Sequence, residues 1–146
     1  AISAARFVRL AVELEVVRTA AERWNETHRA GFVRNLDAQD KALAQSDARA
    51  FHKLDQEFHR LITEVADTPF AFELIMQKKA LVDRLCVLSL KHADEMAELV
   101  RDHRTIFEKL SARDTTGLEA AMRVHLSRIE KTIHAVRDAH MEYFED

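Results

Sequence analysis

Residues that favour tight turns are scarce in this chain, which has only two glycines and one proline in 146 residues. All-β folds join many short strands through tight turns, and such turns depend on glycine and proline. Hydrophobic residues make up 47% of the chain and charged residues 32%, the balance of a globular domain. The sequence therefore predicts an all-α fold in a single domain.

Apolar residues recur at steps of three and four, which predicts six helices and no strand. The helices are expected at about 3–28, 32–45, 47–66, 69–91, 93–112 and 116–141. Gly31 is expected to end the first helix and Asp47 to cap the third. A capping box of Thr116 and Glu119 is expected to open the last. Short connections between long helices favour an antiparallel bundle of six to seven helices with a site in its interior.

Several classes of protein are excluded by composition. The net charge of -3 argues against nucleic-acid binding by this chain itself. Its longest uncharged stretches are shorter than the ~18 apolar residues of a membrane-spanning helix, so no membrane partner is expected. The single cysteine, Cys86, excludes an internal disulfide and indicates a reducing, cytoplasmic location. Charged residues within 1–14 argue against a signal peptide, and the absence of an initial Met suggests a piece of a longer protein.

Histidines on apolar helix faces are the most informative residues. His103 and His125 fall within the apolar arcs of the fifth and sixth predicted helices. Asp55 lies at the edge of the third helix's arc, and His59 follows one turn later. A buried carboxylate beside neutral imidazoles is costly, and a divalent cation bound by all four side chains would remove that cost. The alternative is that each is a buried polar residue with ordinary hydrogen bonds.

Other metal and catalytic patterns are missing from the sequence. It contains no Glu-x-x-His, no His-Glu-x-x-His and no His-Asp pair, which argues against di-iron bundles, zincin proteases and one type of helical phosphohydrolase. His52 lies two turns before His59 on the same side of the predicted helix, so it is a candidate for a supporting role in a ligand pocket.

Three segments carry a resemblance to a known family. Residues 54–59 (LDQEFH), 102–106 (DHRTI) and 122–126 (MRVHL) resemble the effector-binding C-terminal FCD domain of GntR-type (FadR subfamily) transcription regulators. The resemblance covers essentially the whole chain and implies an all-α bundle. It also implies a metal site formed by Asp55, His59, His103 and His125, with zinc expected first and nickel or manganese as alternatives.

The same resemblance implies a small organic acid, such as a hydroxy or sugar acid, as the effector. Arg9 matches a position that often assists ligand binding, although a salt bridge to Glu13 is an equal alternative. Arg84 is a weaker candidate for contact with the ligand. DNA contact is implied only through a winged-helix domain that this chain does not contain.

The sequence therefore predicts a non-enzymatic, metal-containing sensor domain of a bacterial transcription regulator. Asp55 would cancel one of the two metal charges, leaving about one for an anionic ligand. A homodimer is predicted by a second apolar stripe on the first helix and by the leucines of the fourth. The stripe is formed by Val8, Val12, Val16 and Ala20, and the leucines are Leu74, Leu81, Leu85 and Leu88. Two alternatives stay open: a metal-dependent hydrolase or lyase of small acids, and a purely structural dimerisation bundle.

Overall fold

Six α-helices and one short 3-10 helix make up the part of the chain that the computed structural model describes, residues 2–89 and 93–139. Side chains are described for residues 4, 6–80 and 94–128. The elements are α1 (Ile2–Arg23), η1 (Glu26–His28), α2 (Arg29–Ala44), α3 (Ala48–Ala66), α4 (Pro69–Ser89), α5 (Ala93–Ser111) and α6 (Thr115–Ala139). No strand occurs within these ranges, which confirms the all-α prediction.

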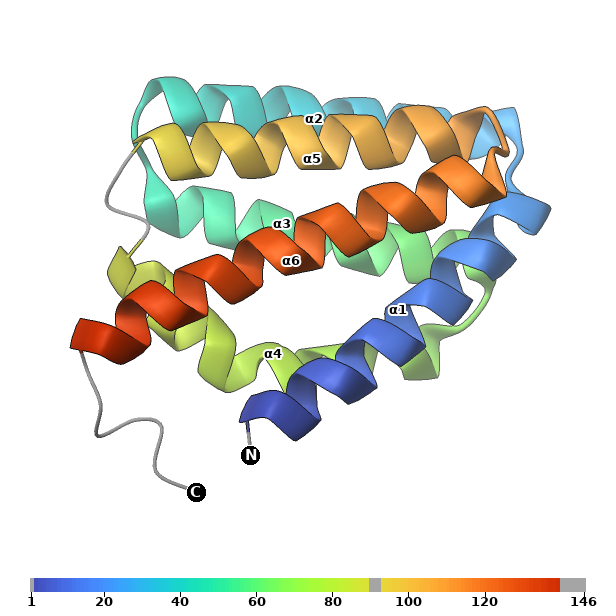
Figure 1. Ribbon diagram of the computed structural model, residues 1–146. Coiled ribbons are helices and arrows are strands. Elements are labelled where there is room, and N and C mark those ends of the chain that lie inside the picture. The colour runs from blue at the N-terminus through green and yellow to red at the C-terminus, as the bar shows by residue number, and fades with distance from the viewer. Residues whose placement is uncertain (1, 90–92, 140–146) are drawn as a thin grey trace.

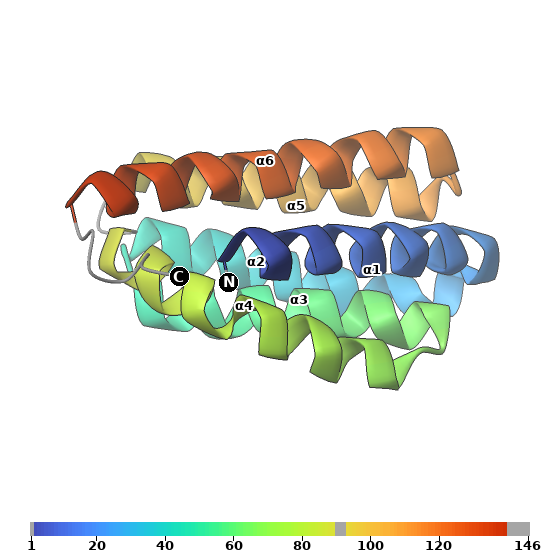
Figure 2. The same cartoon turned by 60° about the horizontal axis from the view of Figure 1, so that its bottom comes forward.

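The helices form a bundle around one interior (Figure 1). Helices α1 and α6 come from the two ends of the sequence, and α2 to α5 come from its middle. Helix α1 packs along α3, α4 and α6, while α2 packs along α3 and α5. Helices α5 and α6 lie side by side as one layer over α1 and α2 (Figure 2). Side chains from α1, α2, α3, α5 and α6 can therefore reach one another in the interior.

The apolar arcs that predicted the helices are the faces that the fold buries. Phe58 of α3, Ile106 of α5 and Leu118 of α6 have no exposed surface. Burying each such side chain contributes roughly 1.5–3 kcal/mol. Together with Val17 and Phe32, they belong to one hydrophobic core that orients the polar residues between them.

The prediction that the first helix continues to His28 and ends at Gly31 is wrong. Helix α1 ends at Arg23, because Asn25 caps the element that follows. The Asn25 side chain accepts a hydrogen bond from the Thr27 amide (2.9 Å), and the Asn25 amide donates to Nδ1 of His28 (3.2 Å). Gly31 instead lies inside α2.

Of the two other predicted caps, one is confirmed and one is wrong. Asp47 does cap α3, since its side chain accepts a hydrogen bond from the Ala50 amide (3.0 Å). The capping box at the start of the last helix is wrong. Asp114 accepts a hydrogen bond there from the Gly117 amide (2.9 Å), and Glu119 instead accepts from Arg18 of α1 (2.7 Å).

The apolar stripe of α1 that predicted a partner surface is partly used within the chain. Val16 and Ala20 of this stripe are buried in the core. Leu74 of α4 is 36% exposed, and the other predicted leucines, Leu81, Leu85 and Leu88, lie outside the residues whose side chains are described.

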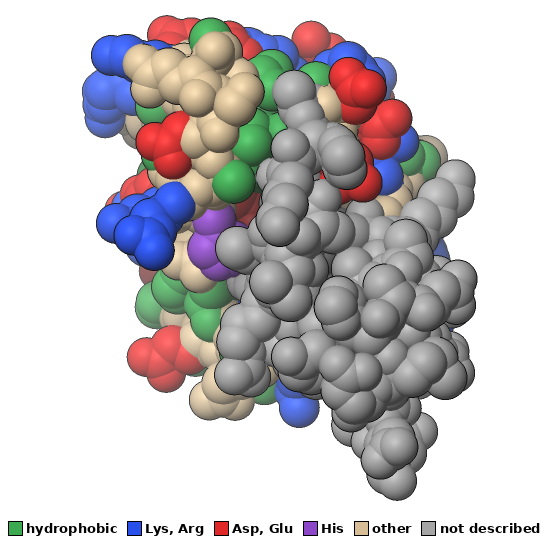
Figure 3. Space-filling view, turned by 90° about the vertical axis from the view of Figure 1, so that its left-hand side faces the viewer, with side chains coloured by type: hydrophobic (Ala, Val, Ile, Leu, Met, Phe, Trp, Pro, Cys, Tyr) green, Lys and Arg blue, Asp and Glu red, His purple; other side chains and the backbone are tan. Residues whose placement is uncertain are grey.

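The surface mixes charges of both signs. On the end of the bundle shown in Figure 3, basic and acidic side chains of the described residues are interspersed with neutral ones. None of the described helices combines the length and apolar character needed to cross a membrane.

Candidate metal centre

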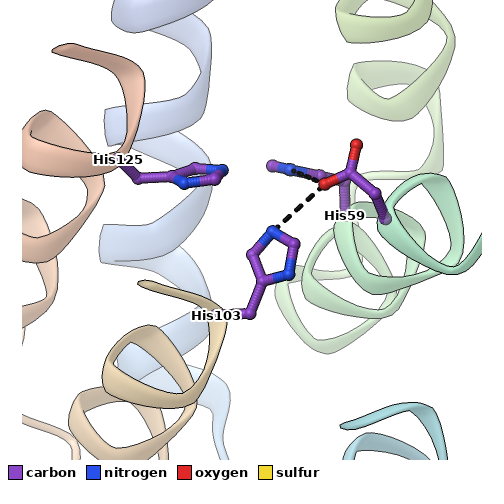
Figure 4. A group of neighbouring side chains, drawn as sticks. His59, His103 and His125 are labelled. Atoms are coloured by element: carbon purple, nitrogen blue, oxygen red, sulfur yellow. Dashed lines mark ion pairs between the residues drawn. The ribbon is translucent and has the colours of Figure 1, made fainter. Parts of the chain in front are cut away.

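Four predicted ligands meet in the interior of the bundle (Figure 4). Asp55 and His59 come from α3, His103 from α5 and His125 from α6, and one ligand atom of each lies within 4.8 Å of the others. Oδ1 of Asp55 is 3.1 Å from Nε2 of His103 and 3.5 Å from Nε2 of His59. Two atoms bound to one ion at about 2.1 Å are roughly 3–3.4 Å apart, so this spacing fits a shared cation.

Each imidazole of the cluster is held from behind through its Nδ1 atom. The acceptors are Glu13 Oε1 for His59 (2.8 Å), Gln39 Oε1 for His103 (2.7 Å) and Asp102 Oδ2 for His125 (3.2 Å). The Nε2 atoms of all three histidines are buried and form no well-aligned hydrogen bond among the described residues, although Oδ1 of Asp55 lies close to those of His59 and His103. Orphaned nitrogens are costly in a protein interior, and a metal ion would satisfy all three at once. The donor set therefore fits a divalent metal.

Aromatic packing restricts the ring of His103 further. The ring of Phe58 stacks on it with centroids 4.5 Å apart and an interplanar angle of 24°. The rings of His103 and His125 lie edge to face at 4.9 Å. These ring contacts restrict the orientation of the imidazoles in addition to the hydrogen bonds at Nδ1.

Every carboxylate around the cluster has a basic partner. The pairs are Glu13 with Arg9 (2.8 Å), Asp55 with Lys79 (2.9 Å) and Asp102 with Arg128 (2.9 Å). Burial alone would raise the pKa of Asp55, but Lys79 and the neighbouring histidines hold that pKa well below its usual value. Burial likewise opposes the shift at Glu13, where Arg9 and His59 lower the pKa. All three side chains are therefore carboxylates in the folded protein.

The histidines differ in proton affinity. Burial lowers the pKa of His103 to about 4, and burial also lowers the pKa of His125. Burial acts in the same direction on His59, but Glu13 and Asp55 outweigh it and raise its pKa to about 8. At neutral pH two imidazoles are thus neutral, the form that binds metal.

The other predicted site residues have separate positions. Arg9 is buried and forms the salt bridge to Glu13 that the sequence left as an alternative. Nε2 of His52 lies 3.4 Å from Nε2 in the side chain of Gln56 on α3. His52 is not one of the four clustered side chains. The side chain of Arg84 lies outside the described residues.

Sequence reasoning missed five residues that support the cluster. They are Gln39, Lys79, Asp102 and Arg128, together with Glu13 in its role as the partner of His59. Lys79 is the most informative of them, because a lysine is only 1% exposed here and lysines are rarely buried without a charged partner. Their contacts join residues from different helices, so no local spacing identifies them. The one available signal was a charged residue on an otherwise buried face.

A cavity of about 550 Å³ lies elsewhere, between α2 and α3. Its lining includes Asn35, Leu54 and Leu61 but none of the four clustered side chains. This cavity is thus separate from the candidate metal centre.

An all-α bundle with three histidines and an aspartate directed into its interior defines a class of helical domain built around a buried polar centre. The sequence of residues 5–128 matches the family described as the FCD domain, and the chain belongs to this family. The resemblance that the three sequence segments indicated is thereby confirmed.

Similar proteins include transcription regulators. The chain is 34% identical over 140 residues to the HTH-type transcriptional repressor RspR of Escherichia coli K12, covering 96% of this chain and 61% of that protein. It is 28% identical to the HTH-type transcriptional repressor NanR of Cronobacter sakazakii, covering 88% of this chain and 50% of that protein. The chain thus spans about half to three fifths of the length of these relatives.

A solved structure has the same fold. E. coli McbR/YncC superposes with a TM-score of 0.79 at 16% identity, covering 94% of this chain and 68% of that one. At this identity the match concerns the fold alone, and it agrees with the predicted all-α bundle.

Proposed function

We propose that this chain is the ligand-sensing domain of a GntR-type transcription regulator, which binds a divalent metal ion and a small organic acid in its interior. The observation that carries the proposal is the set of three buried histidine Nε2 atoms, each without a well-aligned hydrogen bond among the described residues, beside one oxygen of Asp55. The repressors RspR and NanR support a regulatory domain rather than a metal-dependent hydrolase or lyase.

The residues behind the cluster prepare the ligand atoms. Glu13, Gln39 and Asp102 accept hydrogen bonds at Nδ1, so Nε2 is the atom that each ring presents to a metal, after the loss of one proton in the case of His59. Lys79 forms an ion pair with Oδ2 of Asp55, and Oδ1 of the same carboxylate faces the histidines. When bound, the ion would supply positive charge and open coordination positions for an oxygen ligand. Zinc suits this donor set best, and nickel or manganese are alternatives.

Charge favours an acid over a neutral ligand. The sequence-based estimate of about one remaining positive charge omitted the basic partners. Arg9 and Lys79 balance Glu13 and Asp55, and Arg128 is shared between Asp102 and Glu98, so a divalent ion leaves roughly one to two positive charges in a buried site. An anionic effector would offset them, and a neutral sugar would not. Ligand contacts by Arg9, Arg84 and His52 stay predictions.

In the intact protein we expect DNA contact through a separate winged-helix domain and association as a homodimer. Effector binding would shift the packing of the bundle helices and so the relative position of the DNA-binding domains. This step requires a differential affinity of the effector for two arrangements of the dimer.

Metal content tests the assignment directly. Elemental analysis of the purified chain should find one divalent ion per chain, and native mass spectrometry would identify any acid carried with it. His103→Ala and His125→Ala should each abolish stoichiometric binding, because each removes one ligand atom. His28→Ala, at a histidine of η1 outside the cluster, is the matched control and should retain the ion. Unchanged metal content in both ligand variants would refute the assignment.

A further inference from the structure

Helix α2 contributes no ligand to the cluster, yet a series of hydrogen bonds joins it to one ligand and to the residue that precedes another. Nδ1 of His103 lies 2.7 Å from Oε1 of Gln39, and Nε2 of Gln39 donates to Oδ1 of Asn35 (2.6 Å). Nδ2 of Asn35 in turn donates to the backbone carbonyl of Leu54 (3.0 Å), the residue before Asp55. Gln39 is fully buried and Asn35 is 5% exposed, so water does not compete for these groups.

The Leu54 carbonyl, the last acceptor in this series of hydrogen bonds, fixes the direction of every bond in the series. A carbonyl oxygen only accepts hydrogen bonds, so Asn35 must turn its NH2 group toward Leu54 and its oxygen toward Gln39. Gln39 must then donate its NH2 group to Asn35 and present its oxygen to His103. Gln39 presents an acceptor 2.7 Å from Nδ1, whereas Oδ1 of Asp55, although 3.1 Å from Nε2, forms no hydrogen bond with that nitrogen, so the geometry favours the proton of His103 on Nδ1. Its Nε2 is left as a lone pair directed into the cluster.

We infer that Asn35 and Gln39 form a relay that sets the tautomer of His103 and thereby prepares its Nε2 atom for metal. Gln39 is the positioning residue, and Asn35 orients it. The inference rests on the proposed metal site, but its first consequence is a property of the metal-free protein. Neither residue belongs to the set of four predicted ligands.

The relay differs from the supports of the other two histidines. Glu13 and Asp102 are carboxylates, which accept a hydrogen bond in either orientation. The Gln39 amide accepts through one end only, so it depends on Asn35 for its orientation. The relay therefore couples the Leu54 carbonyl, beside one ligand, to another ligand on α5.

Nuclear magnetic resonance of the metal-free chain tests the tautomer. Two-bond proton–nitrogen correlations of the imidazoles, with His103 assigned through its loss in His103→Asn, should show the Nδ1–H form at neutral pH. Observation of the Nε2–H form would overturn the relay, whether or not the protein binds metal. This measurement needs no substitution in α2.

Zinc affinity tests the consequence for binding. Competition against a chelator should show Gln39→Leu binding zinc about 10–100-fold more weakly than the parent, the usual effect of losing such a support. Asn35→Ala should lower affinity less and give a mixture of His103 tautomers, because Gln39 loses its orientation. Gln45→Leu, an exposed glutamine at the end of α2, is the control and should match the parent.

The outcomes separate the two proposals. Zinc affinity of Gln39→Leu within about twofold of the parent would overturn the positioning role, since the expected loss is larger. A parent that binds no zinc but shows the Nδ1–H tautomer would contradict the proposed function and support the relay. If Gln39→Leu does not fold, Asn35→Ala and the parent spectrum still decide.

Discussion

Each of the three histidines of the centre has a side-chain acceptor at Nδ1, but the charges around the three rings differ. His59 lies between two carboxylates, Glu13 and Asp55, and its pKa is raised to about 8. His103 has a neutral amide behind it and its pKa is lowered to about 4, with burial as the main cause. Binding of the proposed metal ion would thus displace a proton from His59 at neutral pH but not from His103.

Stability of the metal-free protein should therefore depend on pH through His59. Its pKa rises from 6.5 in the unfolded chain to about 8 on folding, so its contribution is complete below pH 6.5 and is lost as pH rises through 8. Denaturant titration of chelated protein should show the free energy of unfolding falling by up to about 2 kcal/mol across this window.

Glu13→Gln provides the control, because it removes the nearer of the two carboxylates and should flatten the decline. A free energy of unfolding that stays constant or increases between pH 6.5 and 8.5 in the parent would contradict this account of His59.

At the residue scale, the sequence could predict which side chains cluster but not what supports them. Asp55, His59, His103 and His125 stand out because a polar residue breaks an apolar arc of its own helix. Gln39 lies on a helix where polar residues are common, so its pairing with a residue 64 positions away has no local signature.

At the scale of helices, several ends are formed without glycine. Ser46, Asp67 and Arg113 adopt left-handed backbone conformations with φ of 51°, 58° and 55°. Side chains other than glycine pay a steric cost there. Arg113 offsets that cost, because its guanidinium donates to the carbonyls of Ala21 and Glu22 at the end of α1 (3.1 and 2.6 Å).

Ser46→Gly should accordingly stabilise the domain by about 0.5–1 kcal/mol, because it relieves the strain at an exposed position. Arg113→Gly relieves the same strain but removes the contacts to α1, so it should show no gain. Chemical denaturation of both variants measures the difference. Equal stabilisation by the two substitutions would show that the Arg113 contacts contribute nothing.

Helix periodicity was sufficient to predict the six helices, because the apolar arcs are long and regular. The ends were harder to predict, since several residues compete to cap a helix. Asn25 rather than Gly31 separates α1 from α2, and Asp114 rather than Thr116 caps α6. In each case the cap is the side chain whose oxygen accepts a hydrogen bond from a free backbone amide.

At the scale of the whole molecule, several large apolar side chains among the described residues stay exposed, and the most exposed are two phenylalanines. Phe7 of α1 is 75% exposed and Phe70 at the start of α4 is 73% exposed. Exposed aromatic residues of this size often belong to partner surfaces. We therefore keep the prediction of a two-fold dimer, although part of the α1 stripe is buried within the chain. Sedimentation velocity at micromolar concentration should detect the dimer, and a monomer there would reject it for this domain.

The proposed sensor function requires that the buried centre bind a small organic acid through its metal. Isothermal titration of hydroxy and sugar acids into zinc-loaded protein measures this directly, with the corresponding neutral sugars and chelated protein as controls. At least one acid should bind, its neutral counterpart should bind more weakly, and chelation should abolish binding. Absence of binding by every acid, or equal affinity after chelation, would contradict the sensor mechanism.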